Sequence, residues 1–578
     1  MPESLDLHAL TASGRADKLC EKLKDYSARA QIEEFDRLGR TPLMVAVQSS
    51  RADSEIVRLL LDSGANVHQA STGIEGPRSV LCLAVSAGDP DKVALLLERG
   101  AEIGYQREHG YNALIDALYG RDIRRDSKLL ELIRVLISRG VELNTVTNYK
   151  ESALRVLSRV GRFDAVRLLL NAGASEEQLQ WTPLIRSVAI GTIKDVAREI
   201  EAAASLEERD WWDRTAWLTS VQAGELDKAS LLKEHGADQG ARGRCGKTAL
   251  LYAIENHHSA MLEWLIQNSA AVDETDDFGT TPLMCAAEYE NSEALDRLLR
   301  AGANVDDSRH HEQTALSSAT SRAAAIILLD AGADPSKLSY EGRRAVIGLP
   351  SAPDEDELAV SEDQFRSGRM RRFGTANPEE IKDPFWHCMI RAGVAAFQAK
   401  RRYKFGGNDD RSAVWCAQRF GQSITFLSNG DIVQVAGEHE DSYDEDFCIY
   451  NDVFVHKPDG EIQIYGYPAS VFPPTDFHTA TLIGDYIYLI GSLGYSGHRH
   501  YGTIPVYRLN TESFAIEPIE TRGICPGWIY KHRAVLSGPD EITITRGTLV
   551  THNESGEAHT SNTQTFVFDA SLSFWRIA

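Results

Sequence analysis

The chain has 578 residues, a length that favours several domains or an extended repeat over a single core. Its 61 basic and 84 acidic side chains give a net charge of −23 at pH 7. That charge argues against broad binding to nucleic acid or anionic membranes, because both need a cationic face. Hydrophobic residues make up 43 % and charged residues 25 %, a globular rather than a disordered composition. Proteins, cations and small ligands remain as partner classes.

The cysteines and the N-terminus give no sign of a secreted or membrane protein. None of the eight cysteines lies within four residues of another, so no local CxxC pair exists for zinc or redox chemistry. The opening MPESLDLHALTASG has no basic stretch followed by an apolar run. No apolar stretch reaches the roughly 18 residues that span a bilayer. We therefore expect a cytoplasmic protein with reduced cysteines.

Residues 1–35 hold two helical patterns without any repeated motif, and we expect them to form an N-terminal helical cap. From residue 36 to residue 349 one pattern recurs: Thr-Pro-Leu or a degraded form, an apolar helix, a turn, a second apolar helix and Gly-Ala. The clear copies begin at Thr41, Thr182, Thr215, Thr248, Thr281 and Thr314, and the last five are 33 residues apart. Weaker copies begin at Ser79, Asn112 and Ser152.

Each residue of the motif has a physical role. Thr caps the first helix by accepting a backbone N–H, and Pro at the next position costs no helical hydrogen bond. Gly after the second helix adopts the left-handed conformation that ends it. Because one unit cannot bury its own apolar face, the units must stack. The pattern resembles the ankyrin repeat and implies an α solenoid of about nine repeats plus a terminal half-repeat.

Two copies depart from the regular pattern. The third copy runs 28 residues from Asn112 to Gly140 where regular copies have 21, so GRDIRRDSK carries a seven-residue insertion between its helices. The copy that begins at Thr182 lacks its Gly-Ala. We expect a local change of curvature at that copy.

In proteins that this array resembles, the loop before each Thr projects as a finger, and the finger tips line a concave surface that binds partners. Aromatic side chains at such tips supply large contact area at low entropic cost. On this basis the candidate partner-binding residues are Tyr111, Tyr149, Trp181, Trp211, Trp212, Phe278 and His310. The alternative is that some of these rings fold inward and cover the fingers. The paired histidines lack the spacing of metal ligands, so we predict no metal site there.

The repeat pattern stops near residue 350. Residues 350–384 combine an acidic run and an arginine-rich run with Pro and Gly, which predicts a charged, solvated linker. Residues 385–418 form a helix and lead-in, because FWHCMIRAGVAAFQAKRRY places apolar residues from Phe385 to Phe397 on one helical face. We expect this helix to pack on the following sheet rather than on a membrane or a calmodulin-like partner.

Residues 419–578 alternate apolar and polar side chains, the pattern of strands. Three copies of strand, tight turn, strand and glycine end at Gly437, Gly491 and Gly547, and a further hairpin follows each. The layout resembles Kelch repeats and implies an all-β domain of three four-stranded propeller blades. Three is fewer than the roughly four to eight blades that close a propeller. A small closed propeller, an open three-blade stack capped by the Phe385 helix and half of a dimer's propeller all remain possible.

The sequence offers little chemistry. It contains no P-loop, GxSxG, HExxH, dinucleotide-binding fingerprint or EF-hand spacing, so we predict no catalytic residues, no metal and no cofactor. The acidic stretch 438–446 has ligands for a cation or an acid/base pair, although acidic loops between strands are commonly only solvated. His498 and His500 occupy the matching place in the next copy and would complete a metal site only by converging with that loop.

Because neither module carries a recognised catalytic motif, we predict an interaction protein rather than an enzyme. We expect a scaffold or adaptor that binds a partner protein on the concave ankyrin face, with the Kelch-like domain as a second binding module. An immunity- or antitoxin-type protein that neutralises a toxin is the alternative, since the combination resembles bacterial ankyrin proteins. A metal-dependent oxidase or hydrolase on the β domain is a third, because Kelch-type propellers include copper oxidases. We expect no nucleic-acid or membrane partner; the partner protein and the oligomeric state are not identified by the sequence.

Overall fold

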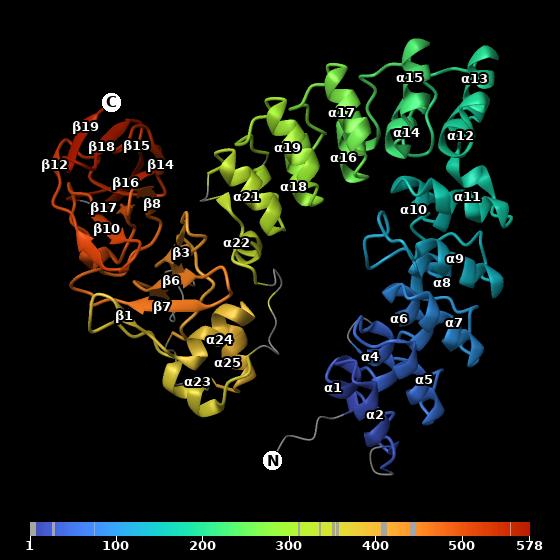
Figure 1. Cartoon of the computed structure of the whole chain (residues 1–578), viewed down its shortest axis with the longest axis horizontal. Coiled ribbons are helices and arrows are strands. Elements are labelled where there is room, and N and C mark those ends of the chain that lie inside the picture. Colours follow the sequence, from blue (N-terminus) through green and yellow to red (C-terminus); the bar gives the residue numbers. More distant parts are fainter. Residues whose placement is uncertain are drawn as a thin grey trace. The chain divides into compact units, whose positions relative to one another are not determined.

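The computed structural model describes residues 7–25, 29–73, 76–309, 313–334, 337–349, 353, 358–405, 413–439, 447–554 and 556–578. The chain divides into two compact units, Met1–Cys285 and Ala286–Ala578, and each is described by itself. Figure 1 labels their helices and strands.

The first unit is a helical repeat array. It begins with α1 (Leu7–Ala12) and α2 (Ala16–Lys22), which lie in the expected N-terminal cap. Seven helix pairs follow: α4 (Pro42–Gln48) and α5 (Ser54–Asp62), α6 (Val80–Ala87) and α7 (Pro90–Glu98), α8 (Ala113–Asp116) and α9 (Leu129–Ser138), α10 (Ala153–Arg159) and α11 (Phe163–Asn171), α12 (Pro183–Ile190) and α13 (Ile193–Glu201), α14 (Ala216–Ala223) and α15 (Leu226–Glu234), and α16 (Ala249–Glu255) and α17 (Ser259–Gln267). Helix α18 (Pro282–Glu288) begins the next pair at the unit's end.

The second unit continues the helical pattern before it changes to strands. Its helices are α19 (Ser292–Arg300), α20 (Ala315–Ser318), α21 (Arg322–Asp330) and the single helix α22 (Tyr340–Val346). The described residues therefore hold nine helix pairs from α4 to α21, followed by α22.

The predicted caps start the first helix of each pair. The Thr41 hydroxyl accepts the Met44 N–H at 3.4 Å, and Thr182 accepts the Ile185 N–H at 3.2 Å. The weaker copies make the same bond through Ser79, Asn112 and Ser152. The register of the motif is therefore the register of the structure.

The insertion in the third copy shortens a helix. Helix α8 has four residues, and the non-helical residues 117–128 separate it from α9. Arg121 and Asp126 form an ion pair within this segment. The Arg162 guanidinium donates to the Ile123 carbonyl at 2.7 Å, which fixes the insertion against the start of α11.

The copy at Thr182 coincides with a bend in the array. The Arg214 guanidinium donates to the Ser158 carbonyl at 2.6 Å, and the Gln222 amide donates to the Arg159 carbonyl at 2.8 Å. Both bonds join α10 to the repeat that contains α14, passing over the intervening pair. Because stacked units normally touch only their neighbours, this contact requires a sharp turn. Figure 1 shows the helix pairs of this unit changing direction between α10 and α14.

The segment expected to be a solvated linker is partly folded. Helix α23 (Glu362–Gly368) buries Phe365, whose ring stacks on Tyr403 at 4.4 Å. Strand β1 (Glu379–Glu380) pairs with β7 (Ile462–Gly466). The structure differs from the prediction because a few apolar side chains, hidden among many charges, are enough to anchor residues 358–384 on the β region.

The helix expected after residue 385 is two helices, α24 (Pro384–Ala392) and α25 (Ala396–Arg402). Gly393 separates them with a φ of +66°, and a Cβ there would lie 2.2 Å from the Arg344 guanidinium. Helix α24 buries Phe385 and Trp386 as expected. Phe397 of α25 is 59 % exposed instead of lying on the same apolar face.

Three sheets form the C-terminal all-β region, and their strand pairs are antiparallel except for β12 with β19, which is parallel. Sheet 1 has the order β1-β7-β6-β3-β2, sheet 2 β11-β10-β9-β8 and sheet 3 β12-β19-β18-β15-β14. The strands are β2 (Ser423–Phe426), β3 (Ile432–Val435), β6 (Val453–His456), β8 (Thr479–Ile483), β9 (Tyr486–Ile490), β10 (Val506–Asn510), β11 (Ile516–Pro518), β12 (Arg522–Gly523), β14 (Arg533–Leu536), β15 (Glu541–Thr545), β18 (Phe566–Asp569) and β19 (Phe574–Ile577). Short extra strands lie outside these sheets. Between β3 and β6, β4 (Glu438–His439) pairs with β5 (Cys448–Ile449). Between β15 and β18, β16 (Thr548–Asn553) pairs with β17 (Gly556–Ser561), and β16 also pairs with β13 (Trp528–Tyr530).

The sheets are layered by their apolar faces. One face of sheet 1, with Phe454 and Ile464, packs on Trp386 of α24. Its other face packs on sheet 2, where the cluster includes Val433 and Leu489. The second face of sheet 2 packs on sheet 3 through side chains that include Ile490, Ile542 and Phe568.

On the outer face of sheet 3, Arg576 pairs with Glu541 at 3.0 Å, beside the exposed apolar side chains Val535 and Phe574. Within the described residues the three sheets form no closed ring, so the expected propeller is not seen. The layering matches the open stack capped by the Phe385 helix among the three arrangements considered.

Candidate functional site

The array holds its fingers by the same local geometry in several repeats. The first residue of a finger accepts two backbone N–H groups: Asp36 from Leu38 and Arg40, Asp210 from Trp212 and Arg214, and Asp276 from Phe278 and Thr280. Consecutive fingers are joined by a backbone bond, such as Asn148 N–H to the His109 carbonyl at 2.9 Å and Asp277 N–H to the Cys245 carbonyl at 3.0 Å. The tips are therefore fixed platforms.

Two of the predicted aromatic residues project from these tips. Tyr149 is 63 % exposed and Phe278 is 60 % exposed. The His109 ring lies 5.3 Å from the Tyr149 ring, and the neighbouring Val146 is also exposed. Leu38 is exposed at the same finger position in the first repeat. Sequence reasoning missed Leu38 and Val146 because it searched the tips for aromatic rings only.

Tyr111 and Trp181 are half-buried rather than projecting, and both pack against the core of the array. Tyr111 lies 5.7 Å from Tyr119, and Trp181 lies 6.1 Å from Phe163. Both residues directly precede the cap of a first helix, where side chains turn toward the stack. Tyr111 and Trp181 therefore pack between the fingers and the core of the array.

Trp211 and Trp212 lie in the bend. Their rings are 4.8 Å apart and half-buried. The Arg155 guanidinium lies 4.9 Å from the Trp211 ring, and that of Arg159 lies 5.3 Å from the Trp212 ring. Arg244, on the next finger, lies 4.8 Å from the Trp212 ring. These contacts fill the angle between α10 and the repeat of α14, so the two tryptophans have a packing role, in line with the inward-folded alternative given above for such rings.

The bend is held by a buried ion pair that sequence reasoning also missed. Arg214 and Asp210 are both fully buried, with Arg214 Nε donating to Asp210 Oδ2 at 3.0 Å. Arg214 Nη1 donates to the Ser158 carbonyl and to Gln222, and Nη2 donates to the Ser158 hydroxyl and to Asp210. His310, the last predicted tip residue, lies outside the described residues.

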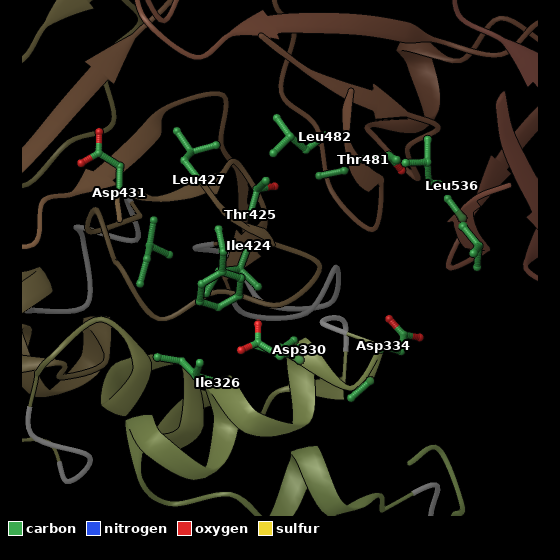
Figure 2. A pocket seen from close by; sticks show the side chains of 18 of the residues that line it. Ile326, Asp330, Asp334, Ile424, Thr425, Leu427, Asp431, Thr481, Leu482 and Leu536 are labelled. Carbon is green, nitrogen blue, oxygen red and sulfur yellow. The ribbon is translucent and has the colours of Figure 1, made fainter. Parts of the chain in front are cut away.

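The second unit contains a cavity of about 580 Å³. Its walls are α21 and the end strands β2, β8 and β14 of the three sheets. Figure 2 shows Ile326 and Asp330 of α21 facing Ile424 of β2 across this space. Most lining side chains are aliphatic, as is usual in ligand pockets. In the sequence, a signal for this cavity is the apolar pair Ile326 and Leu329, three residues apart on the second helix of the last full repeat. No further full repeat follows to cover that pair.

Two of the charged groups at this cavity already have partners. Asp431 accepts from Lys457 Nζ at 2.7 Å, and Arg533 pairs with Asp306 at 3.0 Å. No group of three or more His, Cys, Asp or Glu side chains suited to a metal occurs in the described part of the chain. Residues 440–446, most of the acidic stretch singled out above, lie outside it.

The buried thiol of Cys82 lies beside a carboxylate, so its nucleophilic reactivity has to be considered. Cys82 donates to Asp116, which also binds Tyr105 and Arg107. Burial, reinforced by the Asp116 charge, raises the pKa of Cys82 to about 12. Because the thiolate is the nucleophile, this cysteine is inert at neutral pH. Among the helices that the structure describes, none is long and apolar enough to cross a membrane.

Family models agree with the array. A model described as an ankyrin repeat matches residues 38–72, and one described as ankyrin repeats (3 copies) matches residues 193–276 and 260–338. Ankyrin repeats are therefore present in this chain. The matches end at residue 338, so the likeness of the β region to Kelch repeats is not confirmed.

Similar proteins share the repeats over part of their length. An ankyrin repeat domain-containing protein, SAT10, of Stachybotrys chartarum is 30 % identical over 29 % of this chain and 8 % of its own length. The ankyrin repeat and KH domain-containing protein mask-1 of Caenorhabditis elegans is 30 % identical over 44 % of this chain and 9 % of its own length. The mouse B-cell lymphoma 3 protein homolog is 30 % identical over 32 % of this chain and 40 % of its own length. The alignments thus span less than half of each relative, and these relatives give no support to the expected bacterial type.

Proposed function

We propose that this chain is a scaffold that binds a partner protein through the exposed tips of its ankyrin fingers. The observation that carries the proposal is the pair of exposed aromatic rings, Tyr149 and Phe278, on fingers fixed by backbone hydrogen bonds. An aromatic ring on a rigid support loses little entropy on binding, which is why such residues act as anchors in interfaces. Ankyrin repeats in general bind partner proteins, and their presence in this chain supports the proposal.

The described residues of the fingers divide into two groups in this proposal. Tyr149, Phe278, His109 and Val146 contact the partner. Tyr111, Trp181, Trp211 and Trp212 hold the fingers in place and touch the partner only with their exposed edges. The C-terminal all-β region is the second binding module, and its cavity against α21 is the place where that module would take a ligand.

The test uses the full chain in the cells in which it naturally occurs. A photo-crosslinking amino acid replaces Tyr149 or Phe278 in turn, with Phe397 as the matched control, because Phe397 is an equally exposed ring that is not on a finger. We expect the same discrete crosslinked partner from both finger positions and none from position 397.

The partner identified in this way then allows a quantitative test. Tyr149→Ala combined with Phe278→Ala should weaken its binding about 30-fold or more, since two anchors are lost at about 1.4 kcal/mol per decade. Phe397→Ala should leave the dissociation constant unchanged. Equal binding by the finger variant and the control would show that the tips are not the interface.

A further inference from the structure

A second cavity, of about 350 Å³, adjoins the first in the same unit. Its walls are the segments that lead into the end strands β2, β8 and β14, together with residues near the start of α22. The three segments are equivalent: Gln422 precedes β2, His478 precedes β8 and His532 precedes β14. The cavity therefore lies where the three sheets of the stack meet the end of the helical repeats.

The charges around this cavity are mainly positive, although the whole chain carries −23. The charged lining residues are Lys337, Arg343, Lys531, Arg533 and a single carboxylate, Asp334. Arg533 is neutralised by Asp306 at 3.0 Å. The Arg343 guanidinium donates to the Leu338 carbonyl at 3.3 Å and to the Gln422 carbonyl at 2.8 Å, and no carboxylate among the described residues pairs with it.

Lys531 is the second cation without a described carboxylate partner. Its ammonium lies 4.4 Å from the Phe477 ring, which also lines the cavity. Burial lowers the pKa of Arg343 to about 10, and no carboxylate of the described residues offsets that loss of hydration. A desolvated cation without a counter-charge is unfavourable, and a bound anion would remove that penalty.

The two histidines in the wall fix its shape without adding charge. His478 Nε2 shares a hydrogen bond with the Ser423 hydroxyl at 2.8 Å, and His532 Nε2 shares one with the Thr479 hydroxyl at 2.8 Å. Burial lowers the pKa of each to about 3, so both are neutral at pH 7. The positive charge facing an anion therefore comes from the lysine and arginine side chains of the wall, Arg343 and Lys531 among them.

We propose that this cavity binds a small molecule that carries a phosphate group, held between Arg343 and Lys531. A phosphate dianion balances two cations, and a guanidinium can donate two N–H groups to its oxygens. The cavity is larger than a phosphate ion needs, and Ile424, Ala480 and Ala534 provide apolar surface for a compact organic body. This site is independent of the finger tips and of any partner protein bound there.

The test measures the melting temperature and the binding heat of the full chain with inorganic phosphate and with glycerol 3-phosphate, against chloride at matched ionic strength. We expect saturable binding of both phosphates and a rise of the melting temperature that chloride does not give. Tighter binding of glycerol 3-phosphate would assign the apolar wall to the organic body, and equal affinities would assign recognition to the phosphate group alone.

Two variants make the test specific. Lys531→Gln removes an exposed cation and should weaken phosphate binding at least fivefold, while the matched control Lys382→Gln, on an exposed lysine outside the cavity, should not change it. Arg343→Gln should abolish binding, and Lys531→Gln keeps the test valid if the Arg343 variant is unstable. The same response to chloride as to phosphate, or equal phosphate binding by Lys531→Gln and Lys382→Gln, would overturn the proposal.

Discussion

The ankyrin array and the stack of sheets both grow by adding similar units, but they join those units with different polar groups. In the array, backbone bonds link the fingers, and the bend adds the buried pair Arg214 and Asp210. In the stack, a hydroxyl at the start of one sheet bonds a buried histidine of the next: Ser423 with His478, and Thr479 with His532. An arginine keeps its charge at every accessible pH, whereas a buried histidine is neutral only above the pH at which it is forced to take a proton.

This difference separates two kinds of sensitivity. The array depends on a permanent charge pair at one place, so it is vulnerable to a single substitution there. The stack depends on neutral imidazoles at two junctions, so it is vulnerable to acid. The predictions below test that contrast, from the largest expected effect to the smallest.

The largest effect is expected at the bend. Arg214→Ala leaves Asp210 buried without its partner, and breaking a buried pair in this way typically costs about 3–5 kcal/mol. The measurement is urea unfolding followed by the helical circular-dichroism signal. Arg508→Ala, which removes an exposed pair with Glu517, is the control and should cost at most about 1 kcal/mol. A cost for Arg214→Ala as small as that of the control would show that the ion pair does not stabilise the bend.

The tryptophans of the bend should come next. Trp211→Ala with Trp212→Ala removes two half-buried rings and their contacts with three arginines, which we expect to cost about 2–4 kcal/mol. The same unfolding experiment measures it. An unchanged stability would show that neither ring contributes to packing. Both would then remain candidate partner-binding residues, as the sequence predicts.

Acid should act on the stack of sheets. The folded pKa of His478 and of His532 is about 3, against about 6.5 in an unfolded chain. Between these values the unfolded state binds more protons, so stability is complete above about pH 6.5 and falls as the pH decreases toward 3. We expect a loss on the order of 2 kcal/mol per histidine between pH 6 and pH 4.

Replacing both histidines with glutamine, the residue at the equivalent position before β2, tests whether these histidines cause the acid loss. Gln422 occupies the equivalent position before β2, so His478→Gln with His532→Gln should reduce the pH dependence while the sheets still form. The part that remains is expected from His456 of β6, whose pKa burial also lowers to about 3. The measurement is the melting temperature of the full chain from pH 7 to pH 4. An equally steep acid loss in this variant would place the titrating groups elsewhere.

The smallest effect on stability is expected at the finger tips. Tyr149→Ala with Phe278→Ala removes two exposed rings and should change the free energy of unfolding by at most about 0.5 kcal/mol. The array that loses binding would thus stay as stable as the parent chain, whereas the tryptophan variant of the bend would not. A large loss of stability in the tip variant would show that these rings are part of the packing.

The sequence predicted the local structure of both regions well. Thr at regular spacing fixed the helix caps, and the buried Leu283 and Leu298 confirm the helical register that followed from it. The change from a helical to an alternating pattern located the strands, and the missing Gly-Ala at the Thr182 copy located the bend. These features depend on residues close together in the chain, so their chemistry can be read along it.

Only the tertiary structure decided which faces meet. Arg214 and Ser158 are 56 residues apart, and no local pattern shows that their contact buries Trp211 and Trp212 while leaving Tyr149 and Phe278 exposed. In the same way, a few apolar contacts order the charged segment before residue 385. Arg343 and Lys531, which have no carboxylate partner among the described residues, line one cavity where the three sheets meet. Local periodicity determines which elements form, whereas burial and charge balance are properties of the surfaces that distant elements bring together.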